Sequence, residues 1–482
     1  MKYKIAIYLL AVCSLSSCHI YKSYERPELP TDSLYRKPDI PQVDTLNFGS
    51  LSWREVFTDP QLQSLIEKGL TNNTDLQIAR LRIEEAEATL LSSKLAYLPG
   101  ISLVPQGTVS SFDKQAVTRS YQLPVTASWE IDIFGGLLNA KRKAKAALEQ
   151  SEAYKQAVQT QLITSIANSY YTLLMLDKQL AISEVTAENW KESVKTMREM
   201  KEAGMTNEAA VTQSEANYRS VEADIPDLKR QIREIENALS VVLGDNPQHI
   251  DRNKLENIPL PTRFSSGVPL QLLSNRPDVK QAEMSLAMAY YGTNAARSAF
   301  YPGITINGTA GWTNNVGESI LNPGKFLLSA IGSLVQPLFN KGKNIANLKI
   351  AKAQQEEALL SFKQSLLNAG AEVSDALYMF QSAGEKGVQR EIQVSSLEKS
   401  VDSTTELFLL GTSTYLEVLT AQQSLFSAQL LQVSDRFEQL QAVINLYHAL
   451  GGGWKDDTSV SYTHIRAHET RSNLVCRLLL EK

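Results

Sequence analysis

The sequence predicts a mainly α-helical protein with a smaller β-structured part, built as two tandem structural repeats within 482 residues. Three observations predict this fold class. Landmark motifs recur in the same order about 205 residues apart. Four short segments alternate apolar and polar residues, as half-buried strands do. Two very long segments carry apolar residues at the three-to-four spacing of helices.

The repeat is defined by four landmarks, each of which lies 203 to 207 residues from its counterpart. The pairs are Ala96–Ile101 with Ala299–Ile304, Phe134–Gly136 with Phe339–Gly342, Gly204 with Gly411, and Leu243–Gly244 with Leu450–Gly451. The order is the same in both copies, so chance similarity is a poor explanation. A proline-rich stretch, residues 245–274, separates the copies and has the composition of a linker.

Each repeat is predicted to contain a helix, two strands, a long helix and a shorter helix. Helices are expected at 73–98, 137–203, 207–243, 275–299, 341–410 and 413–450, and strands at 101–111, 119–133, 304–313 and 325–339. Pro124 weakens the second strand, because proline has no N–H to donate to a ladder. Each long helix would span about 100 Å, nearly the length of its two shorter neighbours together, which predicts an elongated helical assembly.

Six segments follow from these boundaries. They are a signal peptide at 1–17, an anchor and equatorial part at 18–72, the first repeat at 73–244, the linker at 245–274, the second repeat at 275–454 and a tail at 455–482. The tail has no apolar period and no helix cap. From about residue 459 it resembles a translated sequencing adapter, so we expect that part to be artefactual.

The N-terminus has the pattern of a secretory signal peptide. Lys2 and Lys4 precede an apolar run at 5–12 that is too short for a membrane-spanning helix. Leu15–Cys18 resembles a bacterial lipobox, after which Cys18 would carry lipid and anchor the chain. The alternative is an ordinary signal peptide with a chance cysteine. The expected location is the outer membrane of a Gram-negative bacterium, with the chain lipid-anchored and extending through the periplasm.

The composition argues against several classes of function. Forty-eight basic and 52 acidic side chains give a net charge of −4, without the basic field that nucleic-acid binding requires. Three cysteines exclude a disulfide scaffold, and five histidines leave little material for a catalytic or metal site. No nucleophile–base constellation and no phosphate-binding glycine motif occurs. We therefore expect no enzymatic activity, no metal and no cofactor other than the covalent lipid on Cys18.

The strands also predict an assembly. Strands with one apolar face, in a chain anchored to the outer membrane, predict a transmembrane β-barrel, because open sheet edges are unstable in lipid. Four strands cannot close a barrel, for which about eight are needed. Three copies, with about twelve strands, would suffice. We therefore expect several copies to contribute to one barrel, and three would also supply enough helices to enclose a lumen; the alternative is a small water-facing sheet.

Five motifs occur in a fixed order along the chain. They are Tyr24–Pro27, Trp53 with Phe57–Leu62, Leu272–Val279 with Ala282 and Glu283, Tyr301–Ile304, and Gly411–Gln422; the third contains Arg276, Pro277 and Asp278. Together they resemble the TolC family of outer-membrane efflux ducts, in the lipoprotein branch that serves RND-type pumps. The resemblance covers nearly everything from Cys18 to Trp454. It implies a homotrimer whose outer-membrane β-barrel continues into a long periplasmic α-helical barrel. Such a channel would passively conduct drugs or other toxic small molecules.

The resemblance also implies partners and sites. The partners would be a periplasmic membrane-fusion adaptor, which docks at the helix tips, and an inner-membrane RND-type pump. The implied docking residues are Gly204, Met205, Thr206, Asn207, Gly411, Thr412, Ser413, Tyr415 and Leu416. The closed entrance would lie at Glu417 and Thr420, where the family often has two aspartates. A ring of Glu417 would favour cations, but the missing second carboxylate puts strong divalent-cation blockage in doubt.

Two other functions stay open on the sequence alone. One is a monomeric coiled-coil lipoprotein that tethers the outer membrane to another layer, and the weaker one is an envelope hydrolase. The eight methionines are scattered, so no methionine-rich copper or silver relay is indicated. The sequence therefore favours export of drugs or other toxic compounds over dedicated metal export.

Overall fold

The computed structural model describes residues 21–27, 48–111, 113, 117–259, 276–313 and 325–454. It divides into two compact units, and each sequence repeat contributes to both. Unit 1 combines Met1–Pro30, Arg80–Tyr154 and Asp278–Ser365, and unit 2 combines Thr31–Ala79, Lys155–Pro277 and Leu366–Lys482. The predicted signal peptide, Cys18, residues 272–275 and the predicted tail lie outside the described residues.

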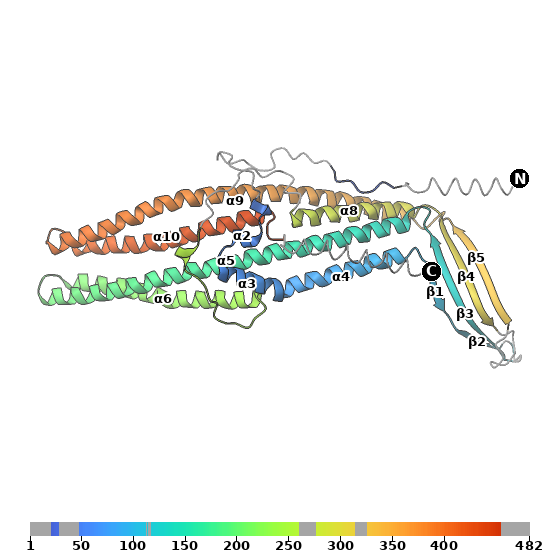
Figure 1. The fold of residues 1–482 in the computed structure, drawn as a ribbon, viewed down its shortest axis with the longest axis horizontal. Helices are drawn as coiled ribbons and strands as arrows, with labels where there is room; N and C mark the ends of the chain where they lie inside the picture. The colour runs from blue at the N-terminus through green and yellow to red at the C-terminus, as the bar shows by residue number, and fades with distance from the viewer. Residues whose placement is uncertain are drawn as a thin grey trace, which may run out of the picture. The chain divides into compact units, whose positions relative to one another are not determined.

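Unit 1 contains an antiparallel sheet (Figure 1). Its strands are β1 (Gly100–Leu103), β2 (Gln106–Ser110), β3 (Thr118–Ile131), β4 (Gly303–Thr313) and β5 (Lys325–Val335). The strand order is β1-β3-β4-β5, and β2 also pairs with β3. The first predicted strand is thus divided into β1 and β2, which follow one another along the same edge of β3.

The register separates the sheet into an apolar and a polar face. Residues paired across strands share a face, because side chains alternate along each strand. The apolar face carries Ile101, Leu103, Leu123, Val125, Trp129, Ile304, Ile306, Ala310, Trp312, Phe326, Leu328 and Leu334. The polar face carries Ser102, Thr126, Ser128, Glu130, Thr305, Asn307, Thr309, Ser329 and Ser333. The alternation predicted for the second and third strands is confirmed.

Strand β5 departs from this pattern. Leu327, Ile331 and Val335 lie on the polar face, so β5 presents apolar side chains on both faces. This explains why the alternation in its sequence is less regular. The predicted extension of this strand to residue 339 is wrong, because β5 ends at Val335, two residues before Pro337.

Pro124 lies inside β3 and does not interrupt it. Its carbonyl accepts a hydrogen bond from the backbone N–H of Val104 at 3.0 Å, in the gap between β1 and β2. The N–H and C=O of one residue in an antiparallel strand point the same way. The donor that Pro124 lacks therefore faces the interruption in the neighbouring edge strand, where no regular ladder needs it.

The helices of unit 1 are α4 (Thr74–Leu95, from Arg80 onward), α8 (Pro277–Ser298) and the first parts of α5 (Gly136–Glu202) and α9 (Lys343–Leu409). The motif at residues 24–27 lies against α8. Arg26 pairs with Glu283, whose side chain is almost completely buried. The backbone N–H of Tyr24 donates to the hydroxyl of Tyr291 at 3.2 Å.

Unit 2 contains η2 (Phe48–Ser50), α2 (Trp53–Val56), α3 (Pro60–Asn72), α6 (Glu208–Val242), η3 (Leu255–Asn257), α10 (Tyr415–Ala449) and the remainders of α5 and α9. Its core includes the fully buried Tyr170. The Tyr170 hydroxyl donates to Asp59 Oδ2 at 2.6 Å and accepts from the Asn253 N–H at 3.0 Å. Asp59 also caps α3 by accepting from the Gln61 N–H. Burial and then the Asp59 hydrogen bond raise the pKa of Tyr170 far above its usual range.

The glycines that served as landmarks of the sequence repeat lie at equivalent helix ends in the two repeats. Gly204, Gly244, Gly411 and Gly451 have φ angles of 74–75°, the left-handed conformation that glycine adopts at helix C-termini. The long predicted helices 137–203 and 341–410 are confirmed as α5 and α9, with ends within two residues of expectation. Within the described residues, no helix is both long and apolar enough to cross a lipid bilayer.

Candidate functional site

The first helix tip joins α5 to α6 at Gly204–Asn207. The Gly204 N–H donates to Lys201 O at 3.0 Å and the Met205 N–H to Met200 O at 2.8 Å, which closes the end of α5. Met205 is largely exposed, and Thr206 is half-buried. Asn207 caps α6, because its side-chain oxygen accepts from the Ala210 N–H at 3.0 Å.

The second tip joins α9 to α10 at Gly411–Thr414. The Gly411 and Thr412 N–H groups donate to Phe408 O and Leu407 O, both at 2.9 Å, so the end of α9 repeats the geometry of α5. The start of α10 differs, because the N-cap residue Thr414 makes no side-chain capping bond. The hydroxyl of Ser413 instead hydrogen-bonds to the carboxylate of Glu417.

A hydrogen bond joins the two tips. The hydroxyl of Ser214, which is buried on α6, donates to the hydroxyl of Tyr415 on α10 at 2.9 Å. The Tyr415 ring contacts Phe408 at a centroid distance of 5.5 Å. Burial raises the pKa of Tyr415, and the contacts with Ser214 and Ser193 oppose that shift. The sequence indicated Tyr415 but gave no signal for Ser214.

The two residues expected at the entrance follow on α10. Glu417 and Thr420 are both exposed and lie about one helical turn apart. The Thr420 hydroxyl donates to Leu416 O of its own helix at 2.8 Å. Glu417 therefore supplies the only carboxylate at these two positions. Leu416 beside it is 66% exposed.

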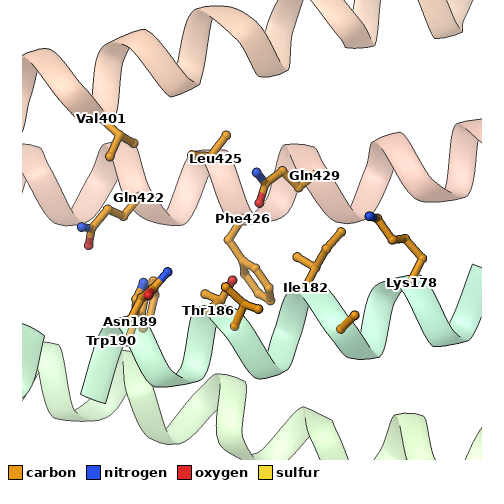
Figure 2. Close-up of a pocket in the computed structure, with 12 residues that line it drawn as sticks. Lys178, Ile182, Thr186, Asn189, Trp190, Val401, Gln422, Leu425, Phe426 and Gln429 are labelled. Carbon is orange, nitrogen blue, oxygen red and sulfur yellow. The ribbon is translucent and has the colours of Figure 1, made fainter. Parts of the chain in front are cut away.

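Farther along unit 2, a cavity of about 400 Å³ opens between α5 and the α9–α10 pair. Figure 2 shows Trp190 and Ile182 from α5 and Phe426 and Gln422 from α10 along this cavity. Phe426 packs against a small core of Ala187, Trp190 and Val221 and so connects α10 to α5 and α6. The buried Oε1 atom of Gln422 has no hydrogen-bond partner among the described residues. The cavity is thus lined by both amide and apolar side chains.

A buried ion cluster connects α9 to α10. The side chain of Asp435, only 4% exposed, lies 2.7 Å from Arg390 Nε and 2.8 Å from Lys386 Nζ. Burial would raise the pKa of Asp435, but hydrogen bonds from Arg390 and Lys386 outweigh it and lower the pKa. The ionised carboxylate therefore stabilises the folded protein, fully above the unfolded pKa of about 3.9 and less as pH falls through the lower folded value.

We expect Asp435→Asn to destabilise unit 2 by about 2 kcal/mol at pH 7, because it leaves Arg390 and Lys386 without their shared carboxylate. Thermal unfolding followed by circular dichroism measures the change. The difference from wild type should shrink below about pH 4, where the wild-type carboxylate becomes protonated. Asp402→Asn, at an exposed position of α9, is the matched control and should leave the midpoint unchanged. Equal effects at pH 7 and pH 3 would contradict the proposed role of the charge.

The Arg276–Asp278 motif connects the start of α8 to the end of α10. The Arg276 side chain is 3% exposed; its Nη1 donates to Ala449 O at 2.8 Å and its Nη2 to Glu372 Oε2 at 2.6 Å. Pro277 occupies the first position of α8 and Asp278 its first turn, both favourable at a helix N-terminus. The motif is thus built from helix-start residues and a buried guanidinium that caps another helix. In the described part of the chain, no group of three or more His, Cys, Asp or Glu side chains is arranged to hold a metal.

Comparisons with known proteins agree with this architecture. The pattern that defines the family "Outer membrane efflux protein" matches residues 65–245 and again residues 268–452. The cation efflux system protein CusC of Escherichia coli O6:H1 is 30% identical over 93% of this chain and 99% of its own length. A crystal structure of CusC superposes with a TM-score of 0.80, 29% identity and coverage of 90% of this chain and 100% of CusC.

Other similar proteins are named for a lipoprotein or for the efflux of a different compound. The probable outer membrane lipoprotein SilC of Salmonella typhimurium is 30% identical over 93% of this chain and 97% of SilC. The toluene efflux pump outer membrane protein TtgC of Pseudomonas putida is 27% identical over 92% of this chain and 94% of TtgC. The two family matches confirm the predicted repeat, and the fold and length agree with the TolC-like channels that the motifs indicated. The chain therefore belongs to the outer membrane efflux protein family, a family of non-enzymatic channels of the outer membrane.

Proposed function

We propose that this outer-membrane efflux channel works as a homotrimer in a tripartite pump. It passively conducts drugs or other toxic small molecules, which an inner-membrane RND-type pump delivers through a periplasmic adaptor. The observation that carries the proposal is the sheet of unit 1, with its apolar face, its polar face and two open edges. The remaining parts of the proposal follow from the chemistry of that sheet and of the helix tips.

The open edges of the sheet support a trimer. β5 forms one edge, and β1 with β2 forms the other, so both edges offer unpaired backbone groups. Unpaired backbone groups are costly in lipid, and the edges of one chain satisfy those of the next if the copies close into a ring. Four strands from each of three copies give about twelve, above the practical minimum of about eight for a closed barrel. The polar face then lines a water-filled passage.

The N-terminal sequence supports lipidation at Cys18. Residues 15–18 have the lipobox pattern, and the relative SilC is described as a probable outer membrane lipoprotein. The described chain begins at Tyr21, and the following residues 22–27 lie on unit 1, which contains the sheet. A lipid on Cys18 would therefore enter the membrane close to that unit. Its role is an anchor and not a step of transport.

The helix tips support adaptor docking. Met205 at the first tip and Leu409, Leu410 and Leu416 at the second are each at least 66% exposed. Apolar side chains concentrated on exposed turns are typical of a protein interaction site. The docking partner would be the helical end of the adaptor. The Tyr415–Ser214 hydrogen bond is one contact that such docking would need to break to separate the tips.

The substrate proposal rests on the polar face of the sheet, on which Glu130 is the one carboxylate among the described residues of the paired strands. Serine, threonine and asparagine side chains dominate it, and such a surface tolerates solutes of many kinds. The relatives CusC and TtgC are named for cation and toluene efflux, respectively. The scattered methionines favour organic small molecules as the substrates of this chain.

The mass of the detergent-extracted protein tests the assembly directly. Light scattering with the detergent mass subtracted should give three times the mass of one mature chain, and planar bilayers should then show ion conductance. A stable monomer under mild extraction would leave both sheet edges open. The channel proposal would then fail, and the monomeric tethering lipoprotein would replace it.

Replacing Glu417 by glutamine should weaken the cation selectivity of the open channel, because a threefold ring of carboxylates attracts cations at the entrance. We expect the cation-to-anion permeability ratio to fall on the order of twofold. Reversal potentials in a salt gradient measure this ratio. Glu208→Gln, in the first turn of α6 at the other tip, is the matched control and should change the ratio less. Unchanged reversal potentials for the Glu417 variant would refute the entrance assignment.

A further inference from the structure

Four segments of unit 1 leave the sheet at the same end. The register pairs Gly100 with Ser128, Ile131 with Ile304, and Gly303 with Val335. The starts of β1 and β4 and the ends of β3 and β5 therefore share one end of the sheet, from which α4, α5, α8 and α9 continue (Figure 1). The adjoining residues gather there: 90–99, 132–145, 290–302 and 336–349.

These four stretches contain one acidic side chain, Asp132, and nine basic ones. We name them the basic collar: Lys94, Lys141, Arg142, Lys143, Lys145, Arg297, Lys341, Lys343 and Lys349. The whole chain, in contrast, has a net charge of −4. On each of the four helices the carboxylates come farther from the sheet, beginning at Glu87, Glu149, Glu283 and Glu356.

Helix electrostatics does not account for the basic collar. The positive N-terminal end of a helix disfavours cations and favours carboxylates. α6, α8 and α10 follow this rule with Glu208, Asp278 and Glu417 in their first turns. The first turns of α5 and α9 hold no acidic residue, although seven collar residues lie at or near these two helix starts. One carboxylate reaches the start of α5 from the preceding connection, where Asp132 Oδ2 accepts from the Leu138 N–H at 2.7 Å. One carboxylate among nine basic side chains leaves a large excess of positive charge, which a partner outside the chain would neutralise.

Most collar residues are also unpaired. Within the part of the chain that the structure describes, Lys145 forms the one ion pair of the collar, with Glu149 at 3.6 Å. Lys141 lies over the ring of Tyr97, and Arg142 donates to the backbone oxygen of Tyr21 at 3.3 Å. Five exposed lysines have no ion pair among the described residues: Lys94, Lys143, Lys341, Lys343 and Lys349. Their ammonium groups are available to an external anion.

Aromatic and apolar side chains lie at the same end of the sheet. Phe134 stacks on Tyr301 at 4.9 Å, and Leu338 and Phe339 are 93% and 86% exposed. Trp129 lies on the apolar face near this end and donates from Nε1 to Tyr97 O at 2.9 Å. Exposed aromatic side chains next to an apolar band are typical of the level of lipid headgroups in a membrane.

We infer that the basic collar binds the anionic headgroups of phospholipids in the periplasmic leaflet of the outer membrane. This inference rests on the proposed function, because it requires the apolar face of the sheet to lie in lipid. The collar lies at the end of the sheet from which the helices leave, which is the periplasmic end of such a channel. Its lysines hold phosphate-bearing headgroups while the adjacent aromatic rings lie among the acyl chains near their glycerol ends. The bound headgroups fix the depth of the sheet in the membrane.

Quenching of tryptophan fluorescence by brominated lipids tests the inference in the full-length protein reconstituted into vesicles. Trp129 and Trp312 lie on the apolar face and report the lipid next to it. We expect brominated phosphatidylglycerol to be favoured over brominated phosphatidylcholine on the order of fivefold at low salt. The preference should fall towards one as salt rises to about 0.5 M, where charges are strongly screened.

Two sets of substitutions test whether the basic collar causes the preference for phosphatidylglycerol. The triple variant Lys143→Gln, Lys343→Gln and Lys349→Gln should reduce the preference to less than about half the wild-type value. The matched control Lys191→Gln, Lys195→Gln and Lys399→Gln removes the same charge from exposed positions of unit 2 and should keep the wild-type value.

The other possible outcomes distinguish a failure of the lipid-binding inference from a failure of the proposed channel function. Absence of quenching by either lipid would refute the placement of the sheet in lipid, and with it the proposed function. Normal quenching without a phosphatidylglycerol preference would refute the inference alone, as would an equal preference in the collar and control variants. Salt-dependent sedimentation with purified peptidoglycan, in place of a lipid preference, would assign the collar to that anionic polymer and overturn the lipid assignment.

Discussion

Replacing Arg276 by methionine is expected to lower the stability of unit 2 by about 3 kcal/mol. The guanidinium is 3% exposed and donates to Ala449 O at the end of α10 and to Glu372 on α9. Methionine fills part of the space but donates nothing, so the buried carbonyl of Ala449 loses a charged donor. The Arg276 atoms that lie beside Gly451 are Cα, Cβ and Cγ, which methionine retains, so the variant mainly removes the hydrogen bonds. The midpoint of thermal unfolding, followed by circular dichroism, measures the loss.

Two further variants show which property of Arg276 matters. Arg276→Lys keeps the charge, but a single ammonium cannot reproduce the fixed fork that reaches both acceptors, so an intermediate midpoint is expected. Arg54→Met removes an arginine whose ion pair with Glu67 at 3.0 Å is solvent-exposed, and it should leave the midpoint nearly unchanged. A wild-type midpoint for Arg276→Met would show that the two hydrogen bonds contribute no net stability.

The elements that were predictable from the sequence are those with a strong local period. The long helices α5 and α9 have apolar residues at helical spacing over many turns, and their C-terminal glycines, Gly204 and Gly411, mark where the chain must turn. β3 alternates regularly enough to be recognised in spite of Pro124. Pro124 is tolerated because the register places it opposite the gap between β1 and β2. The register of a strand depends on its partner strand, so the local sequence around Pro124 could not reveal it.

The sequence predicted where the two helix tips lie, but it did not predict which side chains contact one another there. Glycine, asparagine and threonine mark both turns, but Asn207 caps its helix while Thr414 does not. The hydrogen bond between Ser214 and Tyr415 joins residues 201 positions apart, so it follows from how the helices pack. The sequence analysis did not single out Asp435, which is a buried carboxylate among the apolar buried residues of α10. Its partners on α9 could not be identified without the fold.

The sheet depends on one close approach between β3 and β4. Gly311 on β4 is paired with Pro124 on β3, and both are buried on the polar face. A Cβ at position 311 would lie 2.3 Å from Leu123 O and 2.6 Å from Pro124 Cα. Both are backbone atoms, which cannot rotate away as a side chain can. Gly332 on β5 is paired with Ile306 on the apolar face, and a Cβ added there would meet no atom within 4 Å.

Replacing Gly311 by alanine is therefore expected to separate β3 from β4 and to destabilise the sheet by about 3 kcal/mol. Loss of strand signal in the amide I infrared band and loss of bilayer conductance measure this. Gly332→Ala is the matched control and should retain both, because its new methyl group meets nothing. Pro124→Ala should not rescue the Gly311 variant, since the clash is with the Pro124 Cα and the Leu123 oxygen, which remain. Rescue by that second change would instead place the conflict at the proline ring, and the close backbone approach would not be the constraint that requires glycine.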